Sequence, residues 1–379
     1  MNFNFTEEQQ LIKQNAREFA LEHVEPIAAE LDKTGRYPAE TIKKLTELDF
    51  MGMPYPAEYG GAGADYLSYI LVVEELSRSC ASTGIIYSAH CSLATWPIFK
   101  WGSEELKQKY LVPMCKGDKL GAFALTEPGA GTDAASGTCT ATADGDEYII
   151  NGTKCFITNG GVSDVYIVFA LTDPSQGVKG LSAFVIEAGL PGFEIGKHED
   201  KMGIRGSQTT ELIFKNCRIP KANLIGKEGK GFGIAMQTLD GGRVGVAAQA
   251  LGIAQAALDE AVKFAKERVQ FGKPIATKQA IQWMLADMET KLQAARLLTY
   301  QAAAAKDEGK NFSKEAAMAK MFASEAADFI CLKAIQIHGG YGYIKDFKVE
   351  RLYRDAKICT IYEGTNEVQR MVVSGSVLR

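Results

Sequence analysis

The chain has 379 residues, of which 46% are hydrophobic and 23% are charged. These values exclude an intrinsically disordered chain, and the length favours several structural domains. The formal net charge of -4, without a run of basic residues, argues against a nucleic-acid partner.

Targeting and metal signals are also missing. No apolar stretch is long enough to span a bilayer, and the segment from Met1 to Glu8 is polar, without a signal peptide or an Arg-rich transit pattern. The eight cysteines include no Cys-x-x-Cys pair, and the four histidines are dispersed. We therefore expect a cytoplasmic protein with reduced thiols, no membrane insertion and no metal site.

The first predicted region, residues 1–118, is helical. Apolar residues recur at helical spacing over residues 11–24, and Pro26 lies where a turn or kink is expected. A loop rich in proline and glycine, residues 55–63, precedes a second long helix that includes residues 70–76.

The second region, residues 119–225, has the pattern of a β domain. Short runs of β-branched and aromatic residues occur at 166–170 and 181–186, separated by turn residues. The clearest predicted turns are Asp144-Gly145 and Asn151-Gly152, which bracket a short strand.

The helical period returns in residues 226–379. Long Ala-rich stretches at 246–268, 281–306 and 314–337 predict a helical bundle, and we assign residues 226–379 to a C-terminal four-helix-bundle domain. The expected fold class is α+β, with an N-terminal helical domain, a central barrel-like or sandwich β domain and a C-terminal helical bundle.

Common catalytic motifs are not found. There is no Gly-x-Gly-x-x-Gly between a strand and a helix, no Walker A sequence and no Gly-x-Ser-x-Gly elbow. A nicotinamide dehydrogenase of the doubly wound type, a phosphate-transfer enzyme and a serine hydrolase are therefore disfavoured.

One candidate ligand segment is the loop at residues 123–133, Phe-Ala-Leu-Thr-Glu-Pro-Gly-Ala-Gly-Thr-Asp. Glycines without a Cβ let backbone N–H groups approach a phosphate, and Thr126 and Thr132 add hydroxyl groups. The alternative is an ordinary turn with Asp133 as a cap.

A second candidate is the segment at residues 154–161, which follows the predicted hairpin. The period of two places Phe156 and Thr158 on one face of a strand, as a flat heteroaromatic ring would require. The alternative is that Phe156 belongs to the hydrophobic core.

The third candidate is the segment at residues 361–370, where Glu363 precedes Gly364 and a final helix. Gly364 would let a ligand approach, and burial beside Tyr362 and a cofactor ring would raise the basicity of Glu363. The alternative is that Glu363 or Glu367 only marks the start of the helix.

Together these segments resemble the acyl-CoA dehydrogenase family, in which the Thr-Glu-Pro loop and the Ile-Tyr-Glu-Gly-Thr segment recur. Residues 268–273 and 336–342 extend the resemblance, which covers essentially the whole chain. Within the family, the chain is most similar to bacterial short-chain (butyryl-CoA) dehydrogenases.

The resemblance implies FAD as the cofactor and assigns its site. FAD would contact Phe123, Leu125, Thr126, Thr132, Phe156, Thr158, Thr365 and Glu367. The FAD of a neighbouring subunit would contact Arg268, Phe271, Gln279, Gln336, Ile337, His338, Gly339 and Gly340, so a homotetramer is implied. Many family members have Trp in place of Phe156, and we expect flavin binding to survive that difference.

The resemblance also assigns the chemistry. Glu363 would remove the α-proton of an acyl-CoA while a hydride leaves the β-carbon for flavin N5, and electrons would pass to electron-transferring flavoprotein. The substrate would contact Thr132, Asp240, Arg243 and Gly364. In some branches the base stands on an earlier helix, but the matching residue here is Gly242, which cannot act as a base.

Other interpretations stay open at this point. Arg268 could simply end its helix, residues 338–340 could be a glycine C-cap, and Asp240 with Arg243 could be an internal ion pair. The substrate could be a branched, longer or aryl acyl-CoA, and the reaction could run as an enoyl-CoA reduction. An oxidase and a non-enzymatic DNA-associated relative are less favoured, because oxidases have longer chains and a DNA partner requires a basic surface.

The acyl chain length depends on a pocket floor to which residues 88–99 should contribute. Bulky Trp96 and Phe99 could shorten that pocket, although core packing is the favoured role for both.

Overall fold

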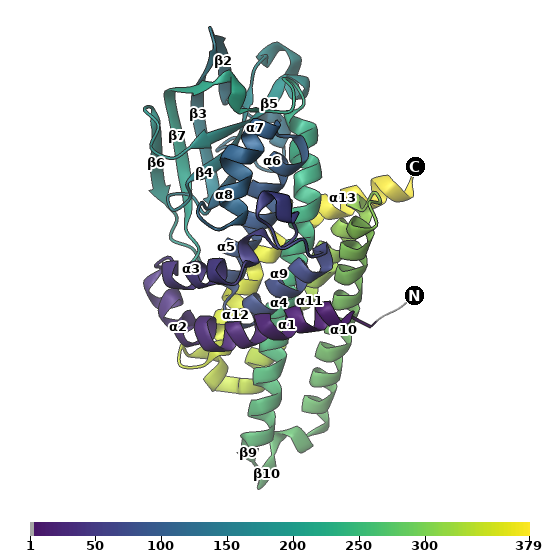
Figure 1. The fold of residues 1–379 in the computed structure, drawn as a ribbon. Helices are drawn as coiled ribbons and strands as arrows, with labels where there is room; N and C mark the ends of the chain where they lie inside the picture. The colour runs from purple at the N-terminus through teal and green to yellow at the C-terminus, as the bar shows by residue number, and fades with distance from the viewer. Residues whose placement is uncertain (1–3) are drawn as a thin grey trace.

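The computed structural model of the protein describes residues 4–379, so residues 1–3 of the polar N-terminal stretch lie outside the described part. Helices form both ends of the chain and strands form its middle, which confirms the predicted fold class. Figure 1 shows the β domain at one end of the molecule, with the long C-terminal helices running away from it. The domain boundaries at 118/119 and 225/226 stay predictions.

The N-terminal part is a set of helices around the buried helix α4. They are α1 (Glu7–Phe19), α2 (Glu25–Thr34), α3 (Ala39–Glu47), α4 (Tyr66–Ser79), α5 (Ala81–Ser88), α6 (Trp96–Trp101), α7 (Glu104–Leu106) and α8 (Val112–Cys115). Thr6 and Gln9 form a capping box at the start of α1. The expected irregularity before Pro26 is a π-helical turn at Ala20–Val24, after which Pro26 lies in the first turn of α2.

The middle part is a mixed β-sheet. Its strands are β1 (Gly121–Ala124), β2 (Thr140–Asp144), β3 (Glu147–Thr158), β4 (Val165–Leu171), β5 (Leu181–Glu187), β6 (Phe193–His198), β7 (Thr209–Pro220) and β8 (Leu224–Ile225). The order across the sheet is β6-β7-β3-β2-β4-β5-β8, and β1 pairs in parallel with β4.

Strand β4 lies in the part of the sheet that is buried on both sides. Alternate residues of a strand point to opposite faces. Val165, Ile167 and Phe169 pack in the core that includes α6 and α8, whereas Tyr166 and Val168 pack in the core inside the β domain. A continuous apolar run therefore serves two cores, as expected for a strand covered on both faces.

One predicted turn is wrong. Asp144-Gly145 does form the turn between β2 and β3, but Asn151-Gly152 lies inside β3, which continues to Thr158. The register of β3 against β7 shifts between Ile150 and Gly152, so this dipeptide forms a bulge. Gly152 has a φ of 144°, a conformation open mainly to glycine, which explains why a bulge and a turn share one sequence signal.

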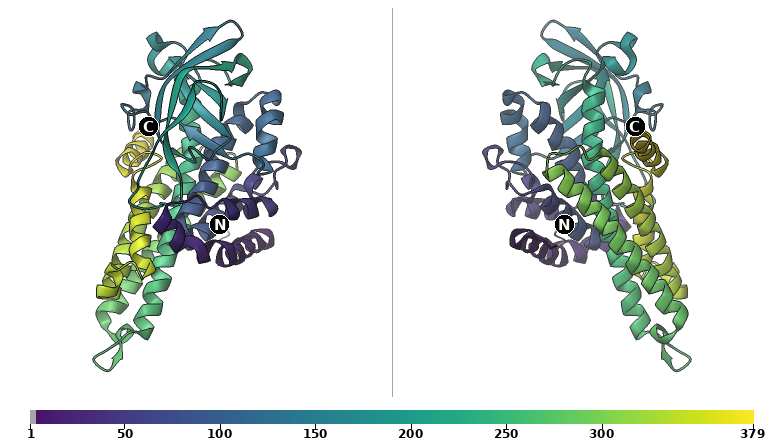
Figure 2. Two further views of the ribbon diagram at one scale, coloured as in Figure 1. Left: turned by 90° about the vertical axis from the view of Figure 1, so that its left-hand side faces the viewer. Right: turned by 90° about the vertical axis from the view of Figure 1, so that its right-hand side faces the viewer.

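The C-terminal part is a bundle of long helices. It contains α9 (Gly231–Glu267), the hairpin of β9 (Val269–Gln270) and β10 (Lys273–Pro274), α10 (Gln279–Asp307), α11 (Ser313–His338), α12 (Lys348–Lys357) and α13 (Asn366–Val377). Figure 2 shows the hairpin at the far tip of the bundle from the β domain.

Helix α9 begins well before residue 246, where the sequence predicted the first long Ala-rich stretch. Glycines along α9 weaken the helical signal, yet they are needed for packing. A Cβ on Gly245 would lie 2.4 Å from Ser88 Oγ, and one on Gly252 would lie 2.3 Å from the carbonyl oxygen of Glu74. The glycines therefore allow α9 to approach α4 and α5 closely.

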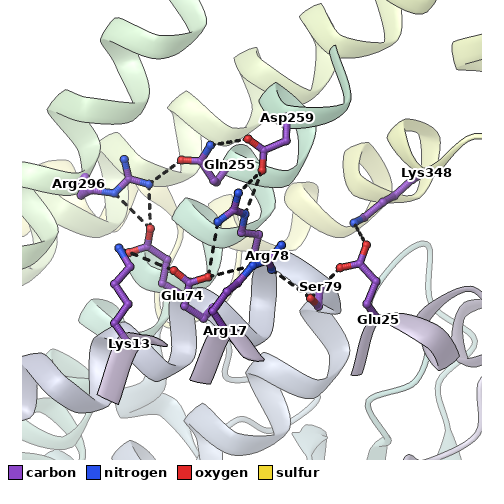
Figure 3. Close-up of polar contacts among 11 residues, drawn as sticks. Lys13, Arg17, Glu25, Glu74, Arg78, Ser79, Gln255, Asp259, Arg296 and Lys348 are labelled. Atoms are coloured by element: carbon purple, nitrogen blue, oxygen red, sulfur yellow. Dashed lines mark hydrogen bonds and ion pairs between the residues drawn. The ribbon is translucent and has the colours of Figure 1, made fainter. Parts of the chain in front are cut away.

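The N-terminal and C-terminal helices share one hydrophobic core, so they form a single packed unit around α4 and α9. A charged network reinforces this contact (Figure 3). Glu74 on α4 accepts hydrogen bonds from Arg296 at 2.8 Å and from Tyr300 at 2.6 Å, both on α10. Arg78 on α4 donates to Asp259 on α9. Over residues 4–379, no helix is long and apolar enough to cross a membrane.

Candidate functional site

Glu363 lies on the short segment that joins α12 to α13. Its backbone is left-handed, with a φ of 56°, and the following Gly364 has a φ of 86°. A non-glycine residue rarely adopts this conformation, and surrounding contacts must hold it there.

Those contacts come from three other helical residues. The carbonyl oxygen of Glu363 accepts hydrogen bonds from Arg243 Nε at 3.3 Å and from Gln369 Nε2 at 3.1 Å. The carbonyl oxygen of Gly364 accepts from Lys320 Nζ at 2.9 Å and from Gln369 Nε2 at 2.8 Å. Side chains from α9, α11 and α13 thus fix the backbone at Glu363.

The residue before Glu363 is fixed as well. The Tyr362 hydroxyl donates to Gln249 Oε1, and Gln249 Nε2 donates to the carbonyl oxygen of Ala81 at 3.1 Å. Gln249 is fully buried in α9. The segment is therefore anchored to the core on both sides of Glu363.

The Glu363 carboxylate itself has a free oxygen. Its Oε2 is shielded from solvent and has no hydrogen-bond partner among the described residues. Burial raises the pKa of Glu363 to about 7, although Arg243 and Lys320 oppose that rise. A buried, unpaired carboxylate with a pKa near neutrality has the properties of a general base.

The helix-start alternative does not fit Glu363. Helix α13 begins at Asn366, and its N-cap is Thr365, whose side chain accepts from Val368 N at 3.4 Å. Glu367 lies in the first turn of α13 and is exposed, so it is the acid whose negative charge interacts favourably with the helix dipole.

Space beside the carboxylate depends on Gly242 of α9. A Cβ at Gly242 would lie 2.9 Å from Glu363 Oε2 and 2.6 Å from Leu93 Cδ2. Leu93 belongs to the π-helical segment Ala89–Thr95, within the residues expected to form the pocket floor. Phe99 instead contacts the aromatic rings of Tyr55 and Tyr59, as a core residue does.

Asp240 and Arg243 do form an internal ion pair, with 2.7 Å between Asp240 Oδ1 and Arg243 Nη1. Both side chains are nearly buried, and the Ser313 hydroxyl also donates to Asp240. Ser313 in turn lines a surface cavity of about 420 Å³ together with Lys314 and Arg379. The ion pair therefore lies between Glu363 and a cavity whose walls carry Lys314, Arg379 and one acid, Glu315.

The glycine-rich loop after β1 is open. Glu127 and Ala130 exchange two backbone hydrogen bonds, at 3.2 Å and 3.0 Å, in a tight turn. A Cβ added at Gly129 or Gly131 would meet no atom within 4 Å, so a ligand can approach the backbone there. The Asp133 side chain makes no capping hydrogen bond within residues 4–379, so the cap interpretation is not supported.

A buried ion pair between Lys154 and Glu127 fixes the backbone of this loop. Lys154 Nζ lies 2.7 Å from Glu127 Oε1 and donates to the carbonyl oxygen of Leu125 at 3.0 Å. Burial raises the pKa of Glu127, but Lys154 and the backbone N–H groups of Thr138 and Cys139 outweigh it, so the pKa stays below its usual range.

Phe156 is not a core residue. Its side chain is 64% exposed and its φ is 57°, next to a register shift in β3. Ile157, its neighbour, is buried, whereas Thr158 is half-buried. The exposed ring of Phe156 lies next to the open loop, because Cys155 N donates to the carbonyl oxygen of Thr126 at 2.9 Å.

A second group of predicted residues gathers towards the tip of the bundle (Figure 1). Arg268 and residues 337–340 line one surface cavity of about 510 Å³, with Arg268 stacked 5.3 Å from the ring centre of Tyr341. Gly339 also caps α11 at a φ of 60°, so the glycine-cap interpretation is correct as well. Phe271 is 93% exposed in the hairpin, and Gln279 and Gln336 are exposed.

Sequence reasoning missed Lys320, Gln369 and Gln249, which hold the Glu363 segment. A signal was present for Lys320: it lies on the same helical face as Ala316, Ala323 and Ser324, where an apolar residue is expected. A charged residue on the buried face of a helix calls for a specific partner.

Comparison with known proteins gives the family. The profiles described as acyl-CoA dehydrogenase N-terminal, middle and C-terminal domains match residues 6–118, 122–217 and 229–378. A "short-chain specific" acyl-CoA dehydrogenase of Clostridium acetobutylicum is 55% identical, with 100% of both chains covered. An acryloyl-CoA reductase (NADH) of Anaerotignum propionicum is 52% identical, covering 100% of this chain and 96% of the relative.

Solved structures agree. Butyryl-CoA dehydrogenase from Megasphaera elsdenii is 52% identical with a TM-score of 0.99, and each chain is covered completely. A chain in a structure described as the electron transferring flavoprotein of Acidaminococcus fermentans is 57% identical with a TM-score of 0.99, also over both full chains. With the matching domain order and identity above one half over the full length, this chain belongs to the acyl-CoA dehydrogenase family of oxidoreductases.

Proposed function

We propose that the protein is an FAD-dependent short-chain acyl-CoA dehydrogenase in which Glu363 is the catalytic base. The observation that carries this proposal is the free, shielded Oε2 of Glu363, on a carboxyl whose pKa burial raises to about 7. A base that is neither hydrogen-bonded nor fully solvated is free to accept a proton from carbon.

The residues around Glu363 support the α-proton step. Oε2 would accept the proton from the α-carbon, and the backbone N–H of Glu363 has no backbone acceptor among residues 4–379. That N–H is available to donate to the thioester oxygen, where negative charge develops as the proton leaves. Arg243 and Gly364 would contact the substrate beside it.

The residues of the open loop fit FAD. Gly129 and Gly131 leave their backbone accessible, Thr126 and Thr132 carry hydroxyl groups, and the exposed ring of Phe156 offers a flat apolar face. When bound, FAD would accept the hydride from the β-carbon. Phe123, Leu125, Thr158, Thr365 and Glu367 would complete this contact.

A neighbouring subunit would supply the rest of the FAD site. Arg268, Phe271, Gln279, Gln336, Ile337, His338, Gly339 and Gly340 lie towards the tip of the bundle, on exposed or cavity-lining surface. In a homotetramer these residues would meet the FAD of another copy. Electron-transferring flavoprotein would be the electron partner and the cytoplasm the location.

The test is reduction of the purified protein by substrate without oxygen. The protein should be yellow, and butyryl-CoA should bleach its visible flavin absorbance faster than octanoyl-CoA does. A folded protein that stays colourless and takes up no flavin would refute the proposal. Equal rates with both thioesters would retain the dehydrogenase and remove the short-chain assignment.

The second candidate is the reverse reaction, the reduction of a short enoyl-CoA. The similarity to the acryloyl-CoA reductase favours it, and the same base would then return the α-proton. Rates measured in both directions with one saturated and unsaturated pair would separate the two.

A further inference from the structure

Lys320 is an unusual residue in helix α11. Its side chain is fully buried, and its Nζ has only neutral acceptors: the Gly364 carbonyl oxygen and Asn366 Oδ1, both at 2.9 Å. No ion pair joins it to a carboxylate in the described part of the chain. A buried cation without a paired anion is costly, so its retention requires a reason.

The contacts of Lys320 converge on the segment that bears Glu363. Asn366, which Lys320 contacts, is held by Ser324 one turn further along α11, with 3.0 Å from Asn366 Nδ2 to Ser324 Oγ. Lys320, Ser324 and Asn366 thus connect α11 to both the end of the Glu363 segment and the start of α13. Because Gly364 O is one of the acceptors, the peptide that follows Gly364 cannot rotate without breaking this bond.

Resting on the function proposed above, we propose that Lys320 is a positioning residue for the catalytic base. Its ammonium group holds the Glu363–Gly364 backbone in the left-handed conformation, and it places a positive charge near the Glu363 carboxylate.

Electrostatics agrees with this geometry. Two cations act on the Glu363 carboxylate, Arg243 from α9 and Lys320 from α11. The phenols of Tyr69 and Tyr362 also interact with that carboxylate. Lys320 itself interacts with Cys359, Glu363, Arg243 and Glu367. Arg243 is already paired with Asp240, whereas Lys320 is not paired. Burial lowers the pKa of Lys320 to about 8, while Cys359 and then Glu363 act to raise it. Each of the two groups therefore favours the charged form of the other.

Two substitutions separate the hydrogen bond from the charge. Lys320→Met removes both, whereas Lys320→Gln removes the charge and keeps a donor for the Gly364 carbonyl. Lys333→Met is the matched control, because Lys333 lies on the same helix, its ammonium lies over the Phe329 ring, and it makes no ion pair within residues 4–379. Wild type and Glu363→Gln complete the set.

The readouts are steady-state rates against pH and amide hydrogen exchange of residues 361–367. In Lys320→Met, kcat should fall about 10²-fold with a nearly unchanged KM and flavin content, and exchange should accelerate. Both Lys320 variants should move the acid limb of kcat to higher pH by about one unit, because the Glu363 carboxylate loses a neighbouring cation. Lys320→Gln should keep exchange near wild type.

The failures are distinguishable. If wild type does not oxidise acyl-CoA, or Glu363→Gln keeps its rate, the proposed function fails. If wild type is active, Glu363→Gln is inactive and Lys320→Met matches Lys333→Met in rate, pH profile and exchange, the role of Lys320 is refuted. Should Lys320→Met not fold, the pH profile of Lys320→Gln decides.

Discussion

Replacing Glu363 with Gln is the most direct perturbation, because the amide keeps the shape of the side chain and cannot accept a proton. Loss of a general base typically costs about 10²–10⁴-fold in rate. We expect kcat for butyryl-CoA to fall by that factor, while flavin content and oligomeric state stay unchanged, since the contacts of the Glu363 backbone do not involve the carboxylate.

The same substitution has a calculable effect on stability. The pKa of Glu363 is about 7 in the folded chain against an ordinary 4.5, so the folded state binds the proton more tightly than the unfolded state does. The resulting stability is fully present below about pH 4.5 and is lost as pH rises through about 7. At about 1.4 kcal/mol per unit, the shift corresponds to about 3 kcal/mol. The amide never ionises and does not lose this stability.

The assay is chemical denaturation of wild type and Glu363→Gln at about pH 5.5 and about pH 8. The advantage of the variant should grow by about 2 kcal/mol between these conditions, because most of the transition lies inside the window. Exposed Glu18→Gln is the control and should show no such pH dependence. Wild-type turnover of Glu363→Gln would show that Glu363 is not the base. A stability difference that is independent of pH would show that its carboxyl is not desolvated.

Other predictions concern neighbouring features. Gly242→Ala should destabilise the protein by about 1–3 kcal/mol and slow turnover, because the new Cβ meets Glu363. Chemical denaturation measures the stability and steady-state kinetics measures kcat, and unchanged values would place the base away from α9. Lys154→Met should lower the free energy of unfolding by about 3–5 kcal/mol in chemical denaturation, since Glu127 is left as a buried unpaired charge. Adding Glu127→Gln to this variant should recover part of that loss. Arg268→Ala should lower the ratio of flavin to protein and weaken the tetramer in sedimentation; retention of both would remove the tip of the bundle from the FAD site.

Local physics made much of the fold readable from sequence. The long helices follow the 3.6-residue period, and β4 follows the run of β-branched and aromatic residues. Pro26 marked the irregular turn before α2, and Asp144-Gly145 marked a hairpin. These signals depend only on neighbouring residues, which is why they succeed.

Sequence patterns that fit two different structures gave a wrong prediction or left two alternatives. Asn151-Gly152 fits a turn and a bulge equally well, and only pairing with β7 selects the bulge. Phe156 fits a core and a ligand face, and its exposure follows from a register shift in β3. The choice depends on partners that are distant in sequence.

The sequence by itself determined the three-part architecture and pointed to Glu363, because periodicity and short motifs are local properties of a chain. Only the tertiary structure decided the environment of Glu363. Its free oxygen, its raised pKa, the space left by Gly242 and the hydrogen bond from Lys320 to the next residue all arise from helices more than forty residues away. Burial and electrostatic interaction depend on distance in space, so they exist only once the helices have packed.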